Sequence, residues 1–204
     1  GLSPNAITFV CILKACGGAK VIKTGKLIHE EIVTRNLLGK EIVLGTALVD
    51  MYAKCGMLAE LQEVFDKLPT QDLISWTSLI GGYAECGHVQ EALDCFYNMQ
   101  SNGIYPDAIA WNTIIASYVH DGEFHDAIQL YQQMQHSNVD PNSVSFVTLL
   151  GICCVLTSIQ RGLSLHAYIV ECGFDTDLSI NSTLVSMYGK CHSIPDAQSV
   201  FNHK

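Results

Sequence analysis

One 35-residue pattern occurs twice in tandem in this chain of 204 residues, at 73–107 and again at 108–142. Several residues of the first copy recur unchanged in the second, as Ile74/Ile109, Trp76/Trp111, Ile80/Ile115, Tyr83/Tyr118, Gly87/Gly122, Ala92/Ala127, Met99/Met134, Gln100/Gln135 and Pro106/Pro141. A fixed period of this size is typical of solenoids, in which each unit is one supersecondary element stacked on the next. The chain has room for about six such units.

Two other kinds of unit flank the tandem copies. A longer unit, Ala6–Glu41, has a copy 137 positions later, with the matches Phe9/Phe146, Cys16/Cys153, Gly25/Gly162 and His29/His166. A shorter unit, Ile42–Asp72, shares the pattern Leu-Val-x-Met-Tyr-x-Lys-Cys with the stretch that begins at Leu178. The last unit stops short, so we expect the sequence to be part of a longer protein.

Apolar residues within a unit follow the period of an α-helix. The first stripe of the third unit has the spacing i, i+3, i+4, i+7, and a second follows; they are Trp76, Leu79, Ile80 and Tyr83, then Val89, Ala92, Leu93 and Phe96. Gly87 suits a left-handed helix end, and Pro106 stops the second helix. We therefore predict an all-α superhelix of about six helix-turn-helix repeats. His192 replaces the glycine of other units, which predicts a strained helix end or a different turn there.

Composition excludes several classes of protein. A hydrophobic content of 49% with 15% charged residues excludes intrinsic disorder. The longest apolar stretch, Phe146–Ile159, is shorter than the roughly 18–20 residues of a membrane span and predicts a buried helix. The nine cysteines include no Cys-x-x-Cys pair, so we expect reduced cysteines and no zinc site.

Charge is unevenly distributed. The net charge of −9 argues against nonspecific binding of polyanions. No Lys or Arg occurs from Leu68 to Gln160, an interval that holds nine acidic residues.

The units resemble pentatricopeptide repeats, of the plant PLS subclass that mixes standard, long and short repeats. By this resemblance the units are long at 6–41, short at 42–72, standard at 73–107 and 108–142, long at 143–177, and short and truncated at 178–204. Tetratricopeptide repeats have a similar length of 34 residues, but their Trp-Leu-Gly-Tyr pattern is absent here.

The resemblance implies binding of single-stranded RNA, one base per repeat, with the N-terminus toward the 5′ end. It places base reading on the fifth and last residues of each unit, Thr46 with Asp72, Thr77 with Asp107, Asn112 with Asn142, and Ser182. It places base sandwiching on the second residues, Val43, Ile74, Ile109 and Val144, and phosphate contact on Lys54 and Lys190. The implied reading of the central units is 5′-G-G-pyrimidine-3′, with a purine at Ser182; Val10 and Val147 of the long units offer no hydrogen bond.

The residue chemistry is compatible with this assignment. Thr77 follows Trp76, so its side chain points about 100° away from the buried stripe. Aspartate only accepts hydrogen bonds, which suits the guanine N1 and N2 donors, whereas asparagine both donates and accepts, which suits a pyrimidine.

Simpler interpretations remain open. The polar residues can be ordinary first-turn side chains, the second residues can pack in the core, and the two lysines can be solvated. Glu85 and His120 stand at the lysine position of the standard units, so we expect this chain alone to bind RNA weakly.

No catalytic grouping accompanies the repeats. His29-Glu30-Glu31 spells the His-x-Glu of zinc deaminases, but the Pro-Cys-x-x-Cys partner is missing, so we expect His29 and His166 to be packing residues. We predict no enzyme activity, no cofactor, no small-molecule substrate and no membrane. The resemblance implies a mitochondrial or chloroplast protein that recognises sites for C-to-U RNA editing, with organellar editing factors as further partners. The alternative is a protein-interaction scaffold that holds an editing factor or peptide without touching RNA.

Overall fold

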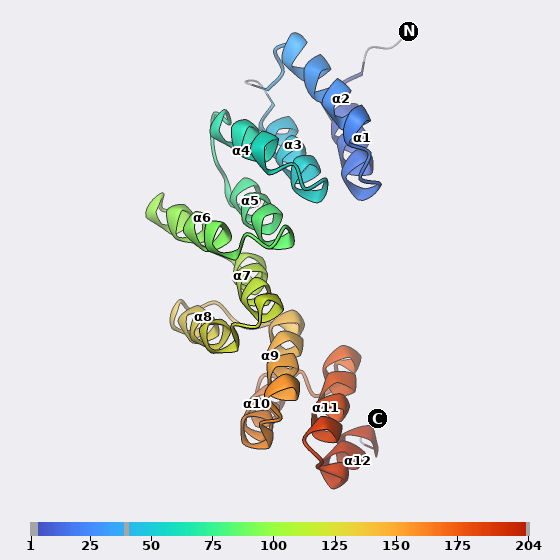
Figure 1. Cartoon of the computed structure of the whole chain (residues 1–204), viewed down its shortest axis with the longest axis vertical. Helices are drawn as coiled ribbons and strands as arrows, with labels where there is room; N and C mark the ends of the chain where they lie inside the picture. Colours follow the sequence, from blue (N-terminus) through green and yellow to red (C-terminus); the bar gives the residue numbers. More distant parts are fainter. Residues whose placement is uncertain (1–3, 39–40, 203–204) are drawn as a thin grey trace. The chain divides into compact units, whose positions relative to one another are not determined.

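The computed structural model describes residues 4–38 and 41–202, and within them every regular element is an α-helix. The twelve helices are α1 (Ala6–Gly18), α2 (Ile22–Thr34), α3 (Ile42–Lys54), α4 (Leu58–Asp66), α5 (Leu73–Glu85), α6 (Val89–Ser101), α7 (Ala108–Asp121), α8 (Phe124–His136), α9 (Ser143–Leu156), α10 (Ile159–Glu171), α11 (Leu178–Lys190) and α12 (Ile194–Asn202) (Figure 1). The prediction of an all-α array of about six helix-turn-helix repeats is confirmed.

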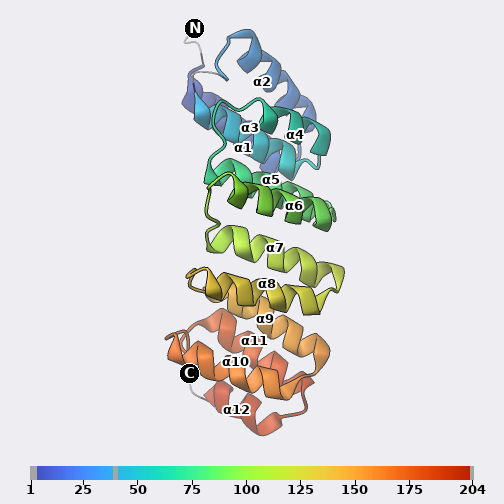
Figure 2. The same cartoon turned by 90° about the vertical axis from the view of Figure 1, so that its left-hand side faces the viewer.

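The chain forms two compact units, Gly1–Ser117 and Tyr118–Lys204. In the first, α1, α3 and α5 pack side by side as one layer, and α2, α4 and α6 form a second layer (Figures 1 and 2). In the second, α9 packs against α11, with α10 and α12 beside them. Within the described residues, no helix is both long enough and apolar enough to cross a membrane.

Aromatic pairs join successive hairpins of the first unit. Trp76 of α5 lies edge-on to Phe65 of α4, with ring centroids 4.6 Å apart. Trp111 of α7 meets Phe96 of α6 in the same way at 4.7 Å. All four rings are buried, and each pair contributes about 0.5–1.5 kcal/mol beyond its buried area. Tryptophan therefore recurs after 35 residues because the same packing contact is made in two successive repeats.

Glycines set the distance between helices where backbones approach. A Cβ on Gly82 of α5 would lie 2.6 Å from Leu61 Cδ2 and 3.3 Å from the backbone Cα of Ala53 on α3. The neighbouring Gly81 would meet nothing within 4 Å. The contact between α3 and α5 therefore depends on the absence of a side chain at Gly82.

One interface recurs in both units. His29 of α2 shares a 2.8 Å hydrogen bond through Nδ1 with the Tyr52 hydroxyl on α3, and His166 of α10 does the same with Tyr188 on α11. Burial lowers the pKa of both histidines and raises the pKa of both tyrosines to about 12. The interpretation of these histidines as packing residues agrees with this half-buried position.

Several helix ends follow the glycine signal of the sequence, and others form without it. The residues after several helices have positive φ, 68° at Gly56, 78° at Gly87 and 87° at Gly122. His192 adopts the same conformation at φ 59°, so the predicted strained end, and not a different turn, is what forms. The expectation of one buried helix over Phe146–Ile159 is wrong at its C-terminal end. The helix α9 ends at Leu156, because Thr157 turns into the left-handed region at φ 48°, and Ile159 begins α10.

Candidate nucleic-acid interface

In four of the helix-turn-helix repeats, the second residue of the first helix is an exposed aliphatic side chain. Val43 on α3, Ile74 on α5 and Ile109 on α7 are 61%, 64% and 62% exposed, all in the first unit. Val144 on α9 of the second unit is 58% exposed. Large aliphatic residues at helical spacing usually fill a core, so their exposure at one repeated position excludes the core-packing interpretation for them.

The fifth residues differ in accessibility. Thr46 and Thr77 are half-buried and Ser182 is exposed, whereas Asn112 is 7% exposed. The Thr77 hydroxyl donates to the Leu73 carbonyl at 2.7 Å. Because its proton is used within the helix, the Thr77 oxygen can only accept a hydrogen bond from a ligand. The low exposure of Asn112 makes it the least accessible of these four side chains.

The last residues of three units cap the helices that follow. Asp72 Oδ1 accepts from the backbone N–H of Ser75 at 2.8 Å, and Asp107 Oδ1 accepts from that of Ala110 at 2.9 Å. Asn142 Oδ1 accepts from the N–H of Ser145 at 3.2 Å, and the hydroxyl of Ser145 accepts from the Asn142 N–H, which completes a capping box. Each cap contributes about 1 kcal/mol and holds the side chain in one orientation. In both aspartates only Oδ1 is used by the cap, which leaves the second oxygen as an acceptor.

A shallow groove of about 370 Å³ crosses the first helices of the first unit. It is lined by Val10 and Lys14 of α1, by Val43, Thr46, Ala47, Asp50 and Lys54 of α3, and by Ile74 and Ser78 of α5. The structure therefore brings four predicted site residues together, Val43, Thr46, Lys54 and Ile74. Asp72, Thr77, Asp107, Ile109 and Asn112 lie elsewhere in the first unit, and Asn142, Val144, Ser182 and Lys190 lie in the second.

Three polar residues of this groove are not among those predicted from the sequence. Lys14, Asp50 and Ser78 each follow a groove residue by four positions on the same helix. Residues four apart share one helix face, so extending each predicted position by one turn would have found them.

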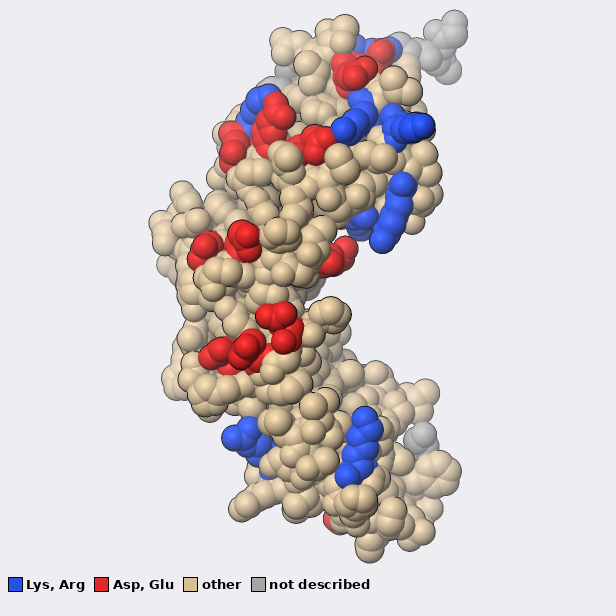
Figure 3. All heavy atoms as spheres, in the orientation of Figure 1, with Lys and Arg blue, Asp and Glu red and all other residues tan. Residues whose placement is uncertain are grey.

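The two predicted phosphate contacts have different surroundings. Lys54 Nζ lies 2.8 Å from Asp50 Oδ2, one turn earlier on α3. Lys190 has Ser186 at the corresponding position and forms no ion pair within the described residues. On the face in view, Figure 3 shows basic side chains over the N-terminal and over the C-terminal helices, and the helices within Leu68–Gln160, which contain no Lys or Arg, show only acidic ones.

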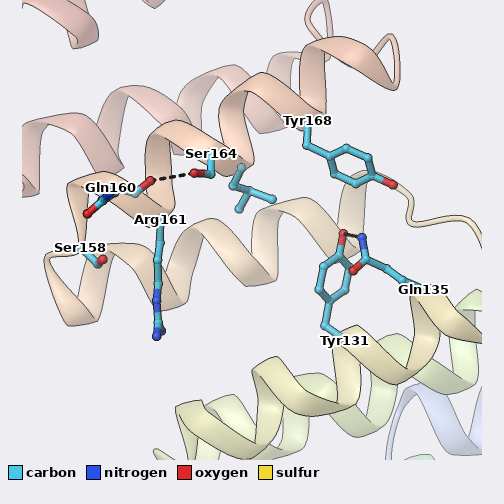
Figure 4. Close-up of a pocket in the computed structure, with 8 residues that line it drawn as sticks. Tyr131, Gln135, Ser158, Gln160, Arg161, Ser164 and Tyr168 are labelled. Carbon is cyan, nitrogen blue, oxygen red and sulfur yellow. Dashed lines mark hydrogen bonds between the residues drawn. The ribbon is translucent and has the colours of Figure 1, made fainter.

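A separate hollow of about 450 Å³ lies between α8 and α10 in the second unit (Figure 4). Tyr131, whose hydroxyl accepts from Gln135 at 3.2 Å, faces it from α8, and Arg161 and Tyr168 face it from α10. Arg161 forms no ion pair in the part of the chain that the structure describes. None of the described residues form a cluster of three or more side chains suited to a metal ion.

Comparison with known families identifies the repeats. The model of the PPR repeat family matches residues 71–110 and 106–155, and that of the PPR repeat matches residues 46–73. Together these ranges run from residue 46 to residue 155, more than half of the chain.

Relatives and solved structures are of the same kind. A mitochondrial pentatricopeptide repeat-containing protein of Arabidopsis thaliana is 28% identical over 99% of this chain, and a chloroplastic one is 26% identical over 99%. The chain spans 16% and 31% of their lengths. The pentatricopeptide repeat protein PPR10 from maize superposes with a TM-score of 0.65 at 20% identity, over 100% of this chain and 34% of that one. PPR10 in complex with an 18-nt psaJ RNA element gives a TM-score of 0.72 at 15% identity, over 100% and 28%.

Proposed function

Because the chain belongs to the pentatricopeptide repeat family, we propose that it recognises single-stranded RNA by sequence, one base per repeat, and catalyses no reaction itself. The observation that carries this proposal is the repetition of two features on successive first helices. Each of these helices has an exposed aliphatic second residue, and a polar cap with a fixed orientation precedes α5, α7 and α9. A protein that only needed to stack would gain nothing from exposing Val43, Ile74 and Ile109.

The proposed reading follows from hydrogen-bonding capacity. In the pair Thr77 and Asp107, the threonine oxygen is restricted to accepting and the aspartate has one oxygen outside its cap. Two acceptors match the N1 and N2 donors of guanine, and Thr46 with Asp72 repeats the pair. Asn112 with Asn142 presents donors and acceptors, which match a pyrimidine. The central units then read 5′-G-G-pyrimidine-3′, and Ser182 adds a purine preference two positions later.

The aliphatic second residues take a different part. Val43, Ile74, Ile109 and Val144 would lie against the flat faces of the bases, where contact is independent of base identity. Recognition and stacking are thereby assigned to separate side chains of each unit. This division requires the units proposed from the sequence, long at 6–41 and 143–177, short at 42–72 and 178–204, and standard at 73–107 and 108–142.

The whole protein is proposed to act in a plant organelle. Relatives are named mitochondrial or chloroplastic, and PPR10 has been crystallised with RNA. We assign this array to recognition of a site for C-to-U RNA editing, with editing factors as protein partners. Because Leu68–Gln160 has no Lys or Arg, the chain alone should bind weakly, since neutralised phosphates supply much of the affinity for nucleic acid.

The test is a titration with single-stranded RNA that contains 5′-GGC-3′, against shuffled RNA and DNA of the same sequence. A paired substitution, Asn112→Thr with Asn142→Asp, should change the preferred third base from pyrimidine to guanine, and the new aspartate can still cap α9. Gln132→Glu on the exposed face of α8 is the control for added negative charge. Equal affinity for GGC and shuffled RNA would refute base reading.

The acidic central span favours one other function. An interval without Lys or Arg suits a basic peptide or editing factor better than it suits RNA. Under this protein-interaction alternative, the titration shows no RNA binding, and a basic partner protein binds with an affinity that falls as salt rises.

A further inference from the structure

The groove over α1, α3 and α5 holds three charged side chains with unequal surroundings. Lys14, Asp50 and Lys54 all line it. Asp50 and Lys54 are paired at 2.8 Å, and their side chains are 29% and 45% exposed. Lys14 is exposed and forms no ion pair within the described residues. The groove therefore has one compensated and one uncompensated lysine.

Lys54 is restrained at both ends of its side chain. Its stem lies over α1, where a Cβ on Gly17 would come 3.2 Å from Lys54 Cδ. Its ammonium group is held by Asp50. A phosphate that approached Lys54 would also approach the Asp50 carboxylate, and the repulsion offsets the attraction.

We propose that Lys14 is the phosphate contact of this groove, and that Asp50 acts as an internal counterion that withholds Lys54 from the RNA backbone. This inference rests on the proposed RNA binding and goes beyond it, because it assigns the contact to a side chain outside the predicted set. The apolar lining, Val10, Val43 and Ile74, places base-stacking surface beside Lys14 in the same groove. A strand whose bases cover these side chains would place a backbone phosphate within reach of Lys14.

The second compact unit already has a serine at the position that corresponds to Asp50. Lys190 corresponds to Lys54, but Ser186 stands where Asp50 stands in the first unit. Lys190 therefore has no acidic residue one turn before it. The substitution Asp50→Ser would give Lys54 the same surroundings as Lys190 in this respect.

The experiment measures affinity for single-stranded RNA containing 5′-GGC-3′ at several salt concentrations, using the whole chain. Each phosphate contact on a single strand contributes about 0.7 to the slope of log K against log salt, or about fivefold in affinity near 0.1 M salt. Lys14→Gln should weaken binding about fivefold and reduce the slope by about 0.7. Asp50→Ser should strengthen binding by about fivefold and steepen the slope, and Ser186→Asp should weaken it.

The control is Lys23→Gln, which removes an exposed lysine of α2 outside the groove and should leave the slope unchanged. A gain of affinity in Asp50→Ser is a result that damage to the fold does not produce. If the wild-type chain binds with sequence preference and Lys14→Gln keeps its affinity and slope, this inference is refuted and the proposed function stands. If the wild-type chain has no sequence preference for RNA, both are refuted.

Discussion

The adjacent glycines of α5 offer a test of packing in which helix propensity cancels. Alanine at either position gains about 1 kcal/mol, because glycine is the less favourable residue in a helix. At Gly81 the new methyl group meets nothing within 4 Å, so Gly81→Ala should stabilise the chain by about that amount. At Gly82 the methyl group would lie 2.6 Å from Leu61 and 3.3 Å from the backbone of Ala53. A side chain can move away, but a backbone atom of a packed helix cannot do so without shifting α3.

Overpacking of this kind costs about 1–3 kcal/mol. Gly82→Ala should therefore range from neutral to about 2 kcal/mol less stable than wild type, and the two variants should differ by about 1–3 kcal/mol. Urea unfolding followed by far-UV circular dichroism gives the midpoint of each variant. Unchanged slopes in urea would show that the midpoints compare stability alone.

Equal stability of Gly81→Ala and Gly82→Ala would contradict this prediction. That result would mean that α3 and α5 separate without cost, so that Gly82 does not set their distance. A double variant that adds Leu61→Ala separates the two contacts, because it removes the Leu61 clash and leaves the Ala53 backbone in place.

Three further predictions concern ionisation and helix ends. Burial lowers the pKa of His29 and His166 below the ordinary value of 6.5, so between these values the unfolded chain binds more protons than the folded one. Stability should therefore fall as the pH drops through this range. Replacing both histidines with leucine should make the melting temperature depend less on pH between pH 8 and 5 than it does in the wild type. His192→Gly should raise stability by about 1 kcal/mol, because glycine adopts the left-handed conformation without strain, and an unchanged urea midpoint would contradict this. Asp72→Ala should cost about 1 kcal/mol in thermal unfolding and Asp72→Asn almost nothing, because asparagine caps a helix equally well; equal losses in the two variants would exclude the cap as the cause.

The fold could be predicted from the spacing of apolar residues along each helix, because the same spacing recurs in every repeat. Trp76 and Trp111 recur at the period of the array, and the stripe of each continues for two turns, so burial and helix type follow from the sequence alone. The end of α9 could not be predicted, because Thr157 offers no glycine or proline and lies within an apolar run. The turn is closed by backbone hydrogen bonds to the Cys153 carbonyl from the N–H groups of Thr157 and Ser158, which any residue at these positions except proline can donate.

Some features of the candidate site could likewise be predicted from a single helix, and others depend on how the helices pack. The half-exposed position of Thr77 follows from its rotation relative to Trp76 on one helix. The pairing of Asp50 with Lys54 is also local, at four residues' separation. The approach of Lys14 to both depends on α1 and α3 lying side by side, which periodicity does not specify. The exposure of the aliphatic second residues could be expected only from the family resemblance, because hydrophobicity by itself predicts that such residues are buried in a core.

The helix caps at Asp72, Asp107 and Asn142 bear on how such an array changes over time. Aspartate, asparagine, serine and threonine all satisfy a helix N-terminus with similar free energies. Exchange among these four residues at the end of a unit would alter the hydrogen bonds offered to a ligand while the helix that follows stays intact. Under the proposed base reading, binding preference at that position can therefore drift by single substitutions that are nearly neutral for folding, and the scaffold places little constraint on which RNA sequence is preferred.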